Sequence, residues 1–83
     1  MKNSNDKNLM FSDFYLSAFC LAKGIRLINI DRTNPRRALF IFDNKKDNQS
    51  LIEDFMFGRS KIEPKKFISA IKELKQLLYQ DYE

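Results

Sequence analysis

Residues 25–43, IRLINIDRTNPRRALFIFD, contain two β-prone runs joined by a turn. The runs are residues 25–31 and 37–43, both rich in β-branched, leucine or aromatic side chains, which favour strands. Between them lies Asn34-Pro35, a dipeptide that is typical of turns. The stretch therefore predicts an antiparallel β-hairpin.

Both faces of this hairpin are apolar. Side chains alternate along a strand, so Phe40 and Phe42 point to one side while Leu39 and Ile41 point to the other. A solvated two-stranded sheet is only marginally stable and would show one polar face, so each side needs a cover. Helices of the chain can cover one side. If they leave the side of Leu39 and Ile41 open, we expect two copies to associate as a homodimer, through those faces or through strand edges.

A helix is expected before the hairpin. Ser12 is a suitable N-cap with Asp13 in the first turn, and Gly24 supplies the left-handed residue that ends helices. Spacings of three and four residues define one apolar stripe, which we interpret as a core face. It consists of Phe11, Phe14, Tyr15, Ala18, Phe19 and Ala22.

Two more helices are expected after the hairpin. Ser50 and Glu53 form a capping-box pattern that starts a short helix, which stops at Gly58. Glu63-Pro64 then opens the last helix, because proline is well tolerated at the first helical position. The buried line of that helix is expected to contain Phe67, Ile71, Leu74 and Leu78, widened by Ile68 and Leu77.

The length of 83 residues suits one core and not two. We expect a flexible polar N-terminal arm over residues 1–10 and a single globular domain over residues 11–83. The fold class is α+β, in the order helix-strand-strand-helix-helix, with the central antiparallel β-hairpin packed on helices. The lone Cys20 and the lack of long apolar runs favour a cytoplasmic protein without a membrane partner.

Catalysis and metal binding are not expected from the residue types present. There is no His to activate Cys20, whose mid-helix position suits a small buried hydrophobe. Glu53 and Asp54 are helix neighbours that diverge by about 100°, which does not suit paired acid and base work. Asp31 and Asp43 end the two runs, where Asp is usually a turn residue. The sequence therefore predicts no enzyme, no cofactor and no metal site.

A basic segment is the feature with the most functional content. Residues 25–49 carry six basic and three acidic groups, and arginine forms bidentate hydrogen bonds with phosphate. The candidate contacts for nucleic acid or for an acidic partner are Arg26, Arg32, Arg36, Arg37, Lys45 and Lys46, with a secondary basic face at Lys65, Lys72 and Lys75. The alternative is a solubilising turn whose charges pair with Asp31, Asp43 and Asp47. Tyr79 and Tyr82 are the aromatic residues off the core stripes that would serve base stacking.

Residues spread along the chain carry a family resemblance. They are Asp13, Tyr15, Leu16, Ala18 and Phe19 before Lys23-Gly24, then Phe40-Ile41-Phe42-Asp43, then Pro64, Phe67 and Leu74-Lys75. Over residues 12–78 the chain resembles a family of short prokaryotic and viral proteins known only as a domain of unknown function. The resemblance implies the same fold and a phage or plasmid context, and it transfers no catalytic residue.

These observations favour a small non-catalytic binding module. We expect it to associate with DNA or RNA through the basic β-hairpin, with phosphate contacts dominating. The alternative is an accessory or inhibitory factor of a phage or other mobile element that docks on another protein. Salt-dependent binding to a random oligonucleotide separates the two.

Overall fold

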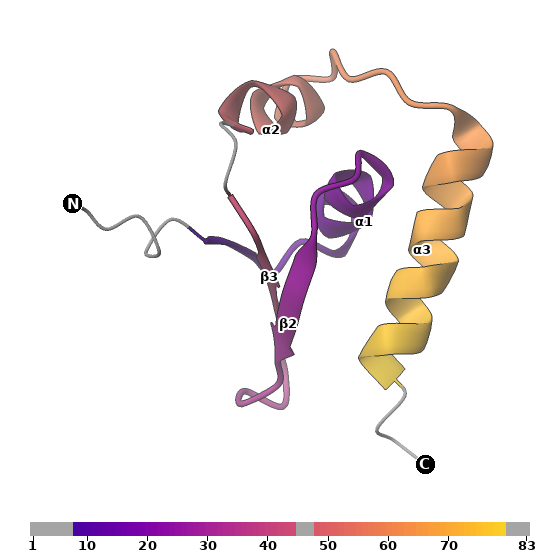
Figure 1. Ribbon diagram of the computed structural model, residues 1–83. Helices are drawn as coiled ribbons and strands as arrows, with labels where there is room; N and C mark the ends of the chain where they lie inside the picture. The colour runs from indigo at the N-terminus through magenta and orange to yellow at the C-terminus, as the bar shows by residue number, and fades with distance from the viewer. Residues whose placement is uncertain (1–7, 45–47, 80–83) are drawn as a thin grey trace.

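A three-stranded antiparallel sheet and three helices make up the computed structural model, which describes residues 8–44 and 48–79 (Figure 1). The elements are β1 (Leu9–Phe11), α1 (Phe14–Ala22), β2 (Leu27–Asp31), β3 (Leu39–Phe42), α2 (Gln49–Met56) and α3 (Pro64–Tyr79). In the sheet the order is β1-β3-β2, so β3 is the central strand. The α+β class and the central hairpin are confirmed.

Strand β1 is the main departure from the expected element order. Leu9 and Met10 are expected in the polar arm, but with Phe11 they form a strand that precedes the first helix. In this strand Leu9 pairs with Phe42, and Phe11 pairs with Phe40. Three residues are too few to show an alternating pattern, and the pairing depends on a partner about 30 residues away, so local sequence does not reveal it. Residues 1–7 of the expected arm lie outside the described residues.

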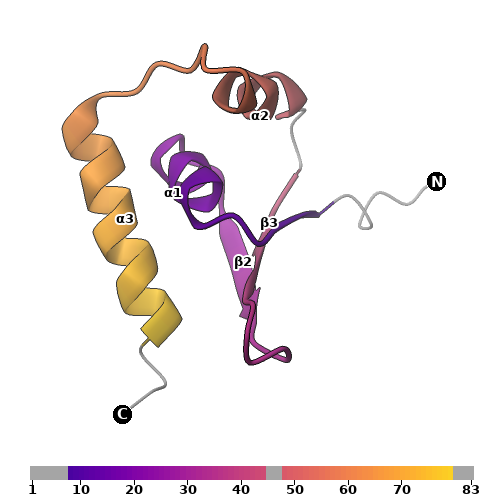
Figure 2. The ribbon, with the colours of Figure 1, turned by 180° about the vertical axis from the view of Figure 1, so that it is seen from behind.

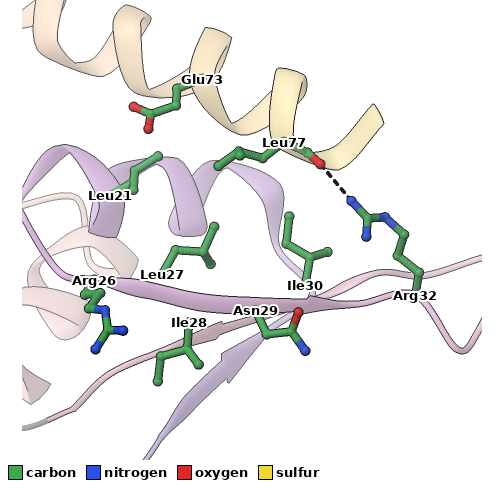
Figure 3. A pocket seen from close by; sticks show the side chains of 9 residues that line it. All are labelled: Leu21, Arg26, Leu27, Ile28, Asn29, Ile30, Arg32, Glu73 and Leu77. Carbon is green, nitrogen blue, oxygen red and sulfur yellow. Dashed lines mark hydrogen bonds between the residues drawn. The ribbon is translucent and has the colours of Figure 1, made fainter. Parts of the chain in front are cut away.

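A β-bulge in β2 changes which side chains face the helices. Regular alternation would place Leu27 and Ile30 on opposite faces. Instead Leu27 pairs with Phe42 and Ile30 with Phe40, with a register shift between Leu27 and Asn29. Figure 3 shows Leu27 and Ile30 pointing toward α3, while Ile28 and Asn29 point away from it. The extra residue, Ile28, therefore brings the side chains of Leu27 and Ile30 to the face of the sheet that the helices cover.

The core lies between that face of the sheet and the helices. In both views α1 lies between the sheet and α3 (Figures 1 and 2). Phe40 is 2% exposed, Phe42 is fully buried, and the ring of Phe14 meets Phe40 edge-on at 6.1 Å between centroids. On the other side of α1, Phe19 packs against Phe55 of α2 at 5.0 Å. The prediction that Phe40 and Phe42 form a core face is confirmed.

Two predicted core positions are wrong. Tyr15 is expected on the core stripe of the first helix, but it is 58% exposed. Ile68 is expected to widen the buried line of α3, but it is exposed, and Ala70 is buried instead. Both errors arise at the edge of an apolar stripe, where the pattern gives the direction of the face but not its width.

The start of α1 differs from the prediction by one residue. Asp13, not Ser12, is the N-cap, and its Oδ1 accepts hydrogen bonds from the backbone N–H groups of Tyr15 (3.0 Å) and Leu16 (3.1 Å). At the other end Gly24 has φ +90°, a left-handed conformation, as expected for the residue that ends this helix.

The predicted capping box of α2 is wrong. The helix begins at Gln49 after Asn48, so Ser50 already lies inside it. The carboxylate of Glu53 accepts a hydrogen bond from Gln49 Nε2 at 3.3 Å. For α3 the prediction is confirmed, since Pro64 is its first residue, and Glu63 Oε1 accepts from the backbone N–H of Lys66 at 3.1 Å.

Arg32 joins the hairpin to the end of α3. Its Nη2 donates to the carbonyl oxygen of Leu77 at 2.7 Å (Figure 3). The same Nη2 (3.0 Å) and the Nε (3.2 Å) donate to Leu78 O. The last carbonyl groups of a helix have no partners within the helix, and a cation there interacts favourably with the helix dipole. Arg32 therefore holds the C-terminal turn of α3 beside the strand that precedes the hairpin turn.

The other face of the sheet carries exposed apolar side chains. Met10 is 61% exposed and Ile28 is 44% exposed, while Leu39 and Ile41 are half-buried. We call these four residues the outer face. Within the described ranges no helix covers it (Figures 1 and 2). None of the helices in the same ranges is long and apolar enough to cross a membrane.

Substituting Phe40 with Ala is expected to lower the free energy of unfolding by about 3–5 kcal/mol, because a fully packed aromatic ring is removed from the core. The control is Ile28→Ala on the outer face, with an expected loss under about 1 kcal/mol. Urea denaturation followed by circular dichroism measures both. Equal losses for the two variants would contradict the assignment of the core face.

Substituting Arg32 with Ala is expected to lower the free energy of unfolding by about 1–2 kcal/mol, because two carbonyl oxygens lose a charged donor. Arg36→Ala is the matched control, since it removes the same charge from an exposed position of the turn and should change stability by less than about 0.5 kcal/mol. Thermal unfolding of the two variants in one buffer gives the comparison. An unchanged Arg32 variant would show that this capping interaction is not stabilising.

Self-association through the outer face stays a prediction. We expect sedimentation equilibrium at high micromolar concentration to detect a dimer, and Ile28→Glu to weaken it by placing a charge within the apolar patch. A wild-type protein that sediments strictly as a monomer at that concentration would eliminate the prediction.

Candidate functional site

The turn between β2 and β3 is held by short-range hydrogen bonds. Asp31 Oδ1 accepts from the backbone N–H of Thr33 at 2.9 Å, and Asn34 Oδ1 accepts from the backbone N–H of Arg36 at 2.9 Å. Hydrogen bonds from the side chain and backbone of Thr33 lower the pKa of Asp31. A backbone bond from Arg37 N–H to Asn34 O (3.1 Å) closes the turn. The turn is thus locally defined and presents two arginines in succession.

A hollow of about 520 Å³ opens where this turn meets the start of α1 and the end of α3. Three cationic side chains line it, two from the turn and one from α3, together with two tyrosines, one from each helix. We call this the basic hollow; its cationic and tyrosine lining residues are Tyr15, Arg36, Arg37, Lys75 and Tyr79. None of the described residues that line it is acidic.

The apolar part of the basic hollow is continuous with the core. Phe14 and Phe40 line it, and the Phe14 ring also meets the Tyr15 ring edge-on at 5.4 Å. Tyr15 and Tyr79 are 58% and 56% exposed. The hollow therefore combines a packed aromatic base with two tyrosine rings accessible to a ligand.

Arg32 helps to set the position of Tyr79. The carbonyl groups that Arg32 binds belong to Leu77 and Leu78, the two residues directly before Tyr79. Leu78 also lines the basic hollow. Arg32 is one of the predicted contact residues, but in the structure its guanidinium group is engaged in capping α3. Arg32 therefore affects the basic hollow indirectly, by holding the C-terminal end of α3, where Leu78 and Tyr79 line the hollow.

The structure brings some of the other predicted contact residues together and leaves Arg26 apart from them. Arg36 and Arg37 of the hairpin are brought together with Lys75 of the secondary basic face. Arg26 does not line the basic hollow; it lies at the start of β2, beside a different hollow (Figure 3). Lys45, Lys46 and Tyr82 lie outside the described residues.

The secondary basic face is divided along α3. Lys72 is exposed and precedes Lys75 by three residues, so it lies on the same side of the helix and extends the positive surface. Lys65 lies about 15 Å from Lys75 along the helix axis, at 1.5 Å per residue. It lines a separate hollow with Glu63 and Glu73, where its charge is offset by carboxylates.

The hollow between β2 and α3 is of similar size, about 510 Å³, and has a different character (Figure 3). Leu21, Leu27 and Leu77 supply much of its apolar lining, and the carboxylate of Glu73 lies on one side. No aromatic side chain lines it among the described residues. Arg26 and Arg32 also line it, so it differs from the basic hollow in having a carboxylate and no aromatic side chain, and it is less suited to a planar ring.

Tyr15 lines the candidate site, and the sequence did not predict it there. Its spacing fits the apolar stripe of α1, so it is expected in the core. The residue type could have indicated this position, because a Tyr at the margin of an apolar stripe can keep its ring at the surface, where the hydroxyl group contacts water.

The remaining reactive groups are engaged elsewhere. Cys20 is fully buried, and burial raises the pKa of its thiol to about 11, so the thiol is protonated at neutral pH. Asp54 Oδ1 lies 3.3 Å from Arg59 Nε in a surface ion pair. Within residues 8–44 and 48–79, no group of three or more His, Cys, Asp or Glu side chains could hold a metal ion.

Comparison with known proteins identifies the family. No curated protein and no solved structure matches the chain. One family model matches residues 6–80, a range that contains all of the described residues and therefore every strand and helix. The match agrees with the expected resemblance to a family of unknown function. The chain belongs to the family described as Domain of unknown function (DUF5659).

Proposed function

We propose that the protein is a non-catalytic module that binds nucleic acid through the basic hollow. The observation that carries the proposal is the convergence of Arg36, Arg37 and Lys75 with two exposed tyrosines, without an acidic side chain among the described lining residues. Cations supply phosphate binding, and aromatic rings supply base contacts that tolerate any sequence. The three cations come from two elements and the tyrosines from two, so the hollow exists only in the folded chain.

The charge arrangement favours contact with phosphate over a purely solubilising turn. The solubilising alternative requires the turn arginines to pair with nearby carboxylates. Within the described ranges neither Arg36 nor Arg37 forms an ion pair, and the Asp31 carboxylate bonds to the backbone of Thr33. Two adjacent guanidinium groups without a bound carboxylate are free to bind phosphate oxygens in bidentate geometry.

An acidic protein surface is the alternative ligand for the same cations. It would fit the second expectation from the sequence, an accessory or inhibitory factor of a mobile element. The tyrosines favour nucleic acid, because every base has a π face that can stack on an aromatic ring, whereas acidic side chains have none. A protein partner is therefore the second outcome to be tested with the same variants.

A triple variant with Arg36, Arg37 and Lys75 changed to Ala is expected to fold normally and to bind nucleic acid more weakly. Phosphate binding releases counterions, so the slope of log affinity against log salt should become shallower by roughly 2 for three lost contacts. Fluorescence anisotropy with a labelled random oligonucleotide, measured over a range of salt concentrations, gives both quantities.

The matched control changes Lys61, Lys65 and Lys66 to Ala, which removes the same charge from exposed positions away from the basic hollow. If binding depends only on net charge, both triple variants will lose affinity and slope equally, and the basic hollow is not the site. Wild-type protein that retains neither single-stranded nor duplex nucleic acid at low salt would refute the proposal, and the variants should then be tested against protein partners.

A further inference from the structure

We infer that the basic hollow selects unpaired bases, so that the ligand of this protein is a single strand, held with its bases on Tyr15 and Tyr79 and its phosphates on Arg36, Arg37 and Lys75. This inference rests on the proposed function and names the form of nucleic acid that the site accepts.

The two tyrosines are the first observation behind the inference. Tyr15 lies in the first turn of α1 and Tyr79 is the last residue of α3. Although they are far apart in sequence, they line one hollow. Each of the two residues is more than half exposed. Stacking a base on such a ring needs a base whose face is not covered by its neighbours.

Away from its two ends, a duplex offers no such base. Its outer surface consists of phosphates and sugars, and its bases are stacked on each other and show only their edges in the grooves. A duplex could contact the cations of the turn, but it would leave the tyrosines and the apolar base of the hollow unfilled. A single strand can turn its bases inward while its backbone stays at the rim.

The position of the cations fits this arrangement. Arg36 and Arg37 reach the hollow from the turn, and Lys75 reaches it from α3. A backbone crossing the opening would therefore meet positive charge from two elements. The volume of about 520 Å³ lies within the range of ~300–1,000 Å³ that is typical of small-ligand sites, so the hollow suits one or two nucleotides and not a long groove.

The shape of the hollow is set before a ligand binds. Hydrogen bonds of Asp31 and Asn34 hold the turn, and the Phe14 ring supports Tyr15 from the core side. Arg32 fixes the end of α3 just before Tyr79. A preformed site loses less conformational entropy on binding, so a short contact can still be selective.

The test compares wild-type protein with a double variant, Tyr15→Leu with Tyr79→Leu, on a 20-nucleotide single strand and on a duplex of the same length. Leucine keeps helix propensity and apolar character but removes the ring. We expect wild-type protein to prefer the single strand, and the variant to lose about 10-fold in affinity for it, with its duplex affinity and salt slope unchanged. DNA and RNA strands are tested in parallel.

Two controls make the result specific. Phe57→Leu removes an aromatic ring that is 69% exposed and does not line the basic hollow, and should leave binding unchanged. Tyr15→Phe with Tyr79→Phe keeps both rings and should retain single-strand affinity. Intrinsic tyrosine fluorescence of wild-type protein should be quenched by the single strand and not by the duplex, a readout that needs no variant.

The outcomes separate this inference from the proposed function. Equal affinity of wild-type protein for single strand and duplex, with normal binding by the leucine variant, would overturn the inference. The proposed function would still stand if the Arg36, Arg37 and Lys75 variant lost binding to both. Failure of wild-type protein to bind either ligand at low salt would overturn both.

Discussion

The burial of Phe40 and Phe42 on one face of β3 organises the sheet and the helices around it. β3 is the central strand, so Phe40 and Phe42 lie between side chains from both neighbouring strands and under α1. The bulge in β2 follows from the same constraint, because it turns Leu27 and Ile30 toward the face where the phenylalanines lie. Without Phe40 and Phe42, the apolar side chains of β1 and β2 would have no neighbours on β3 to pack against.

The basic hollow is a consequence of this core. Phe40 contributes to the hollow at its inner side, and Phe14 connects it to Tyr15. The hydrogen bonds of Arg32 with the last turn of α3 hold that end of the helix, with Tyr79 and Lys75, near the turn arginines. The start of α1, the turn and the end of α3 are distant in sequence, and they are held together by the Phe14–Phe40 contact and by the guanidinium group of Arg32. This explains how short segments around residues 12–15, 36–40 and 75–79 together build a concave site.

The sequence predicts local features well and non-local ones poorly. The hairpin, the first residue of α3 and the left-handed Gly24 depend on neighbouring residues, and all three are confirmed. β1 and the bulge depend on pairing with β3, and the composition of residues 1–10 or simple alternation cannot reveal them. For the candidate site, Arg36, Arg37, Lys75 and Tyr79 were all identifiable from charge and pattern. Their proximity to each other and to Tyr15 required the fold, as did the engagement of Arg32 with α3.

A ¹H–¹⁵N NMR titration of the labelled protein with a short single-stranded oligonucleotide tests whether the basic hollow binds the strand. Shifts of the backbone amides are expected to concentrate at the start of α1, the turn at Arg36 and Arg37, and the end of α3 at Lys75 and Tyr79. These segments are distant in sequence and adjacent only in this fold. Shifts confined to Arg26 and Lys65, or no shifts at low salt, would contradict the account.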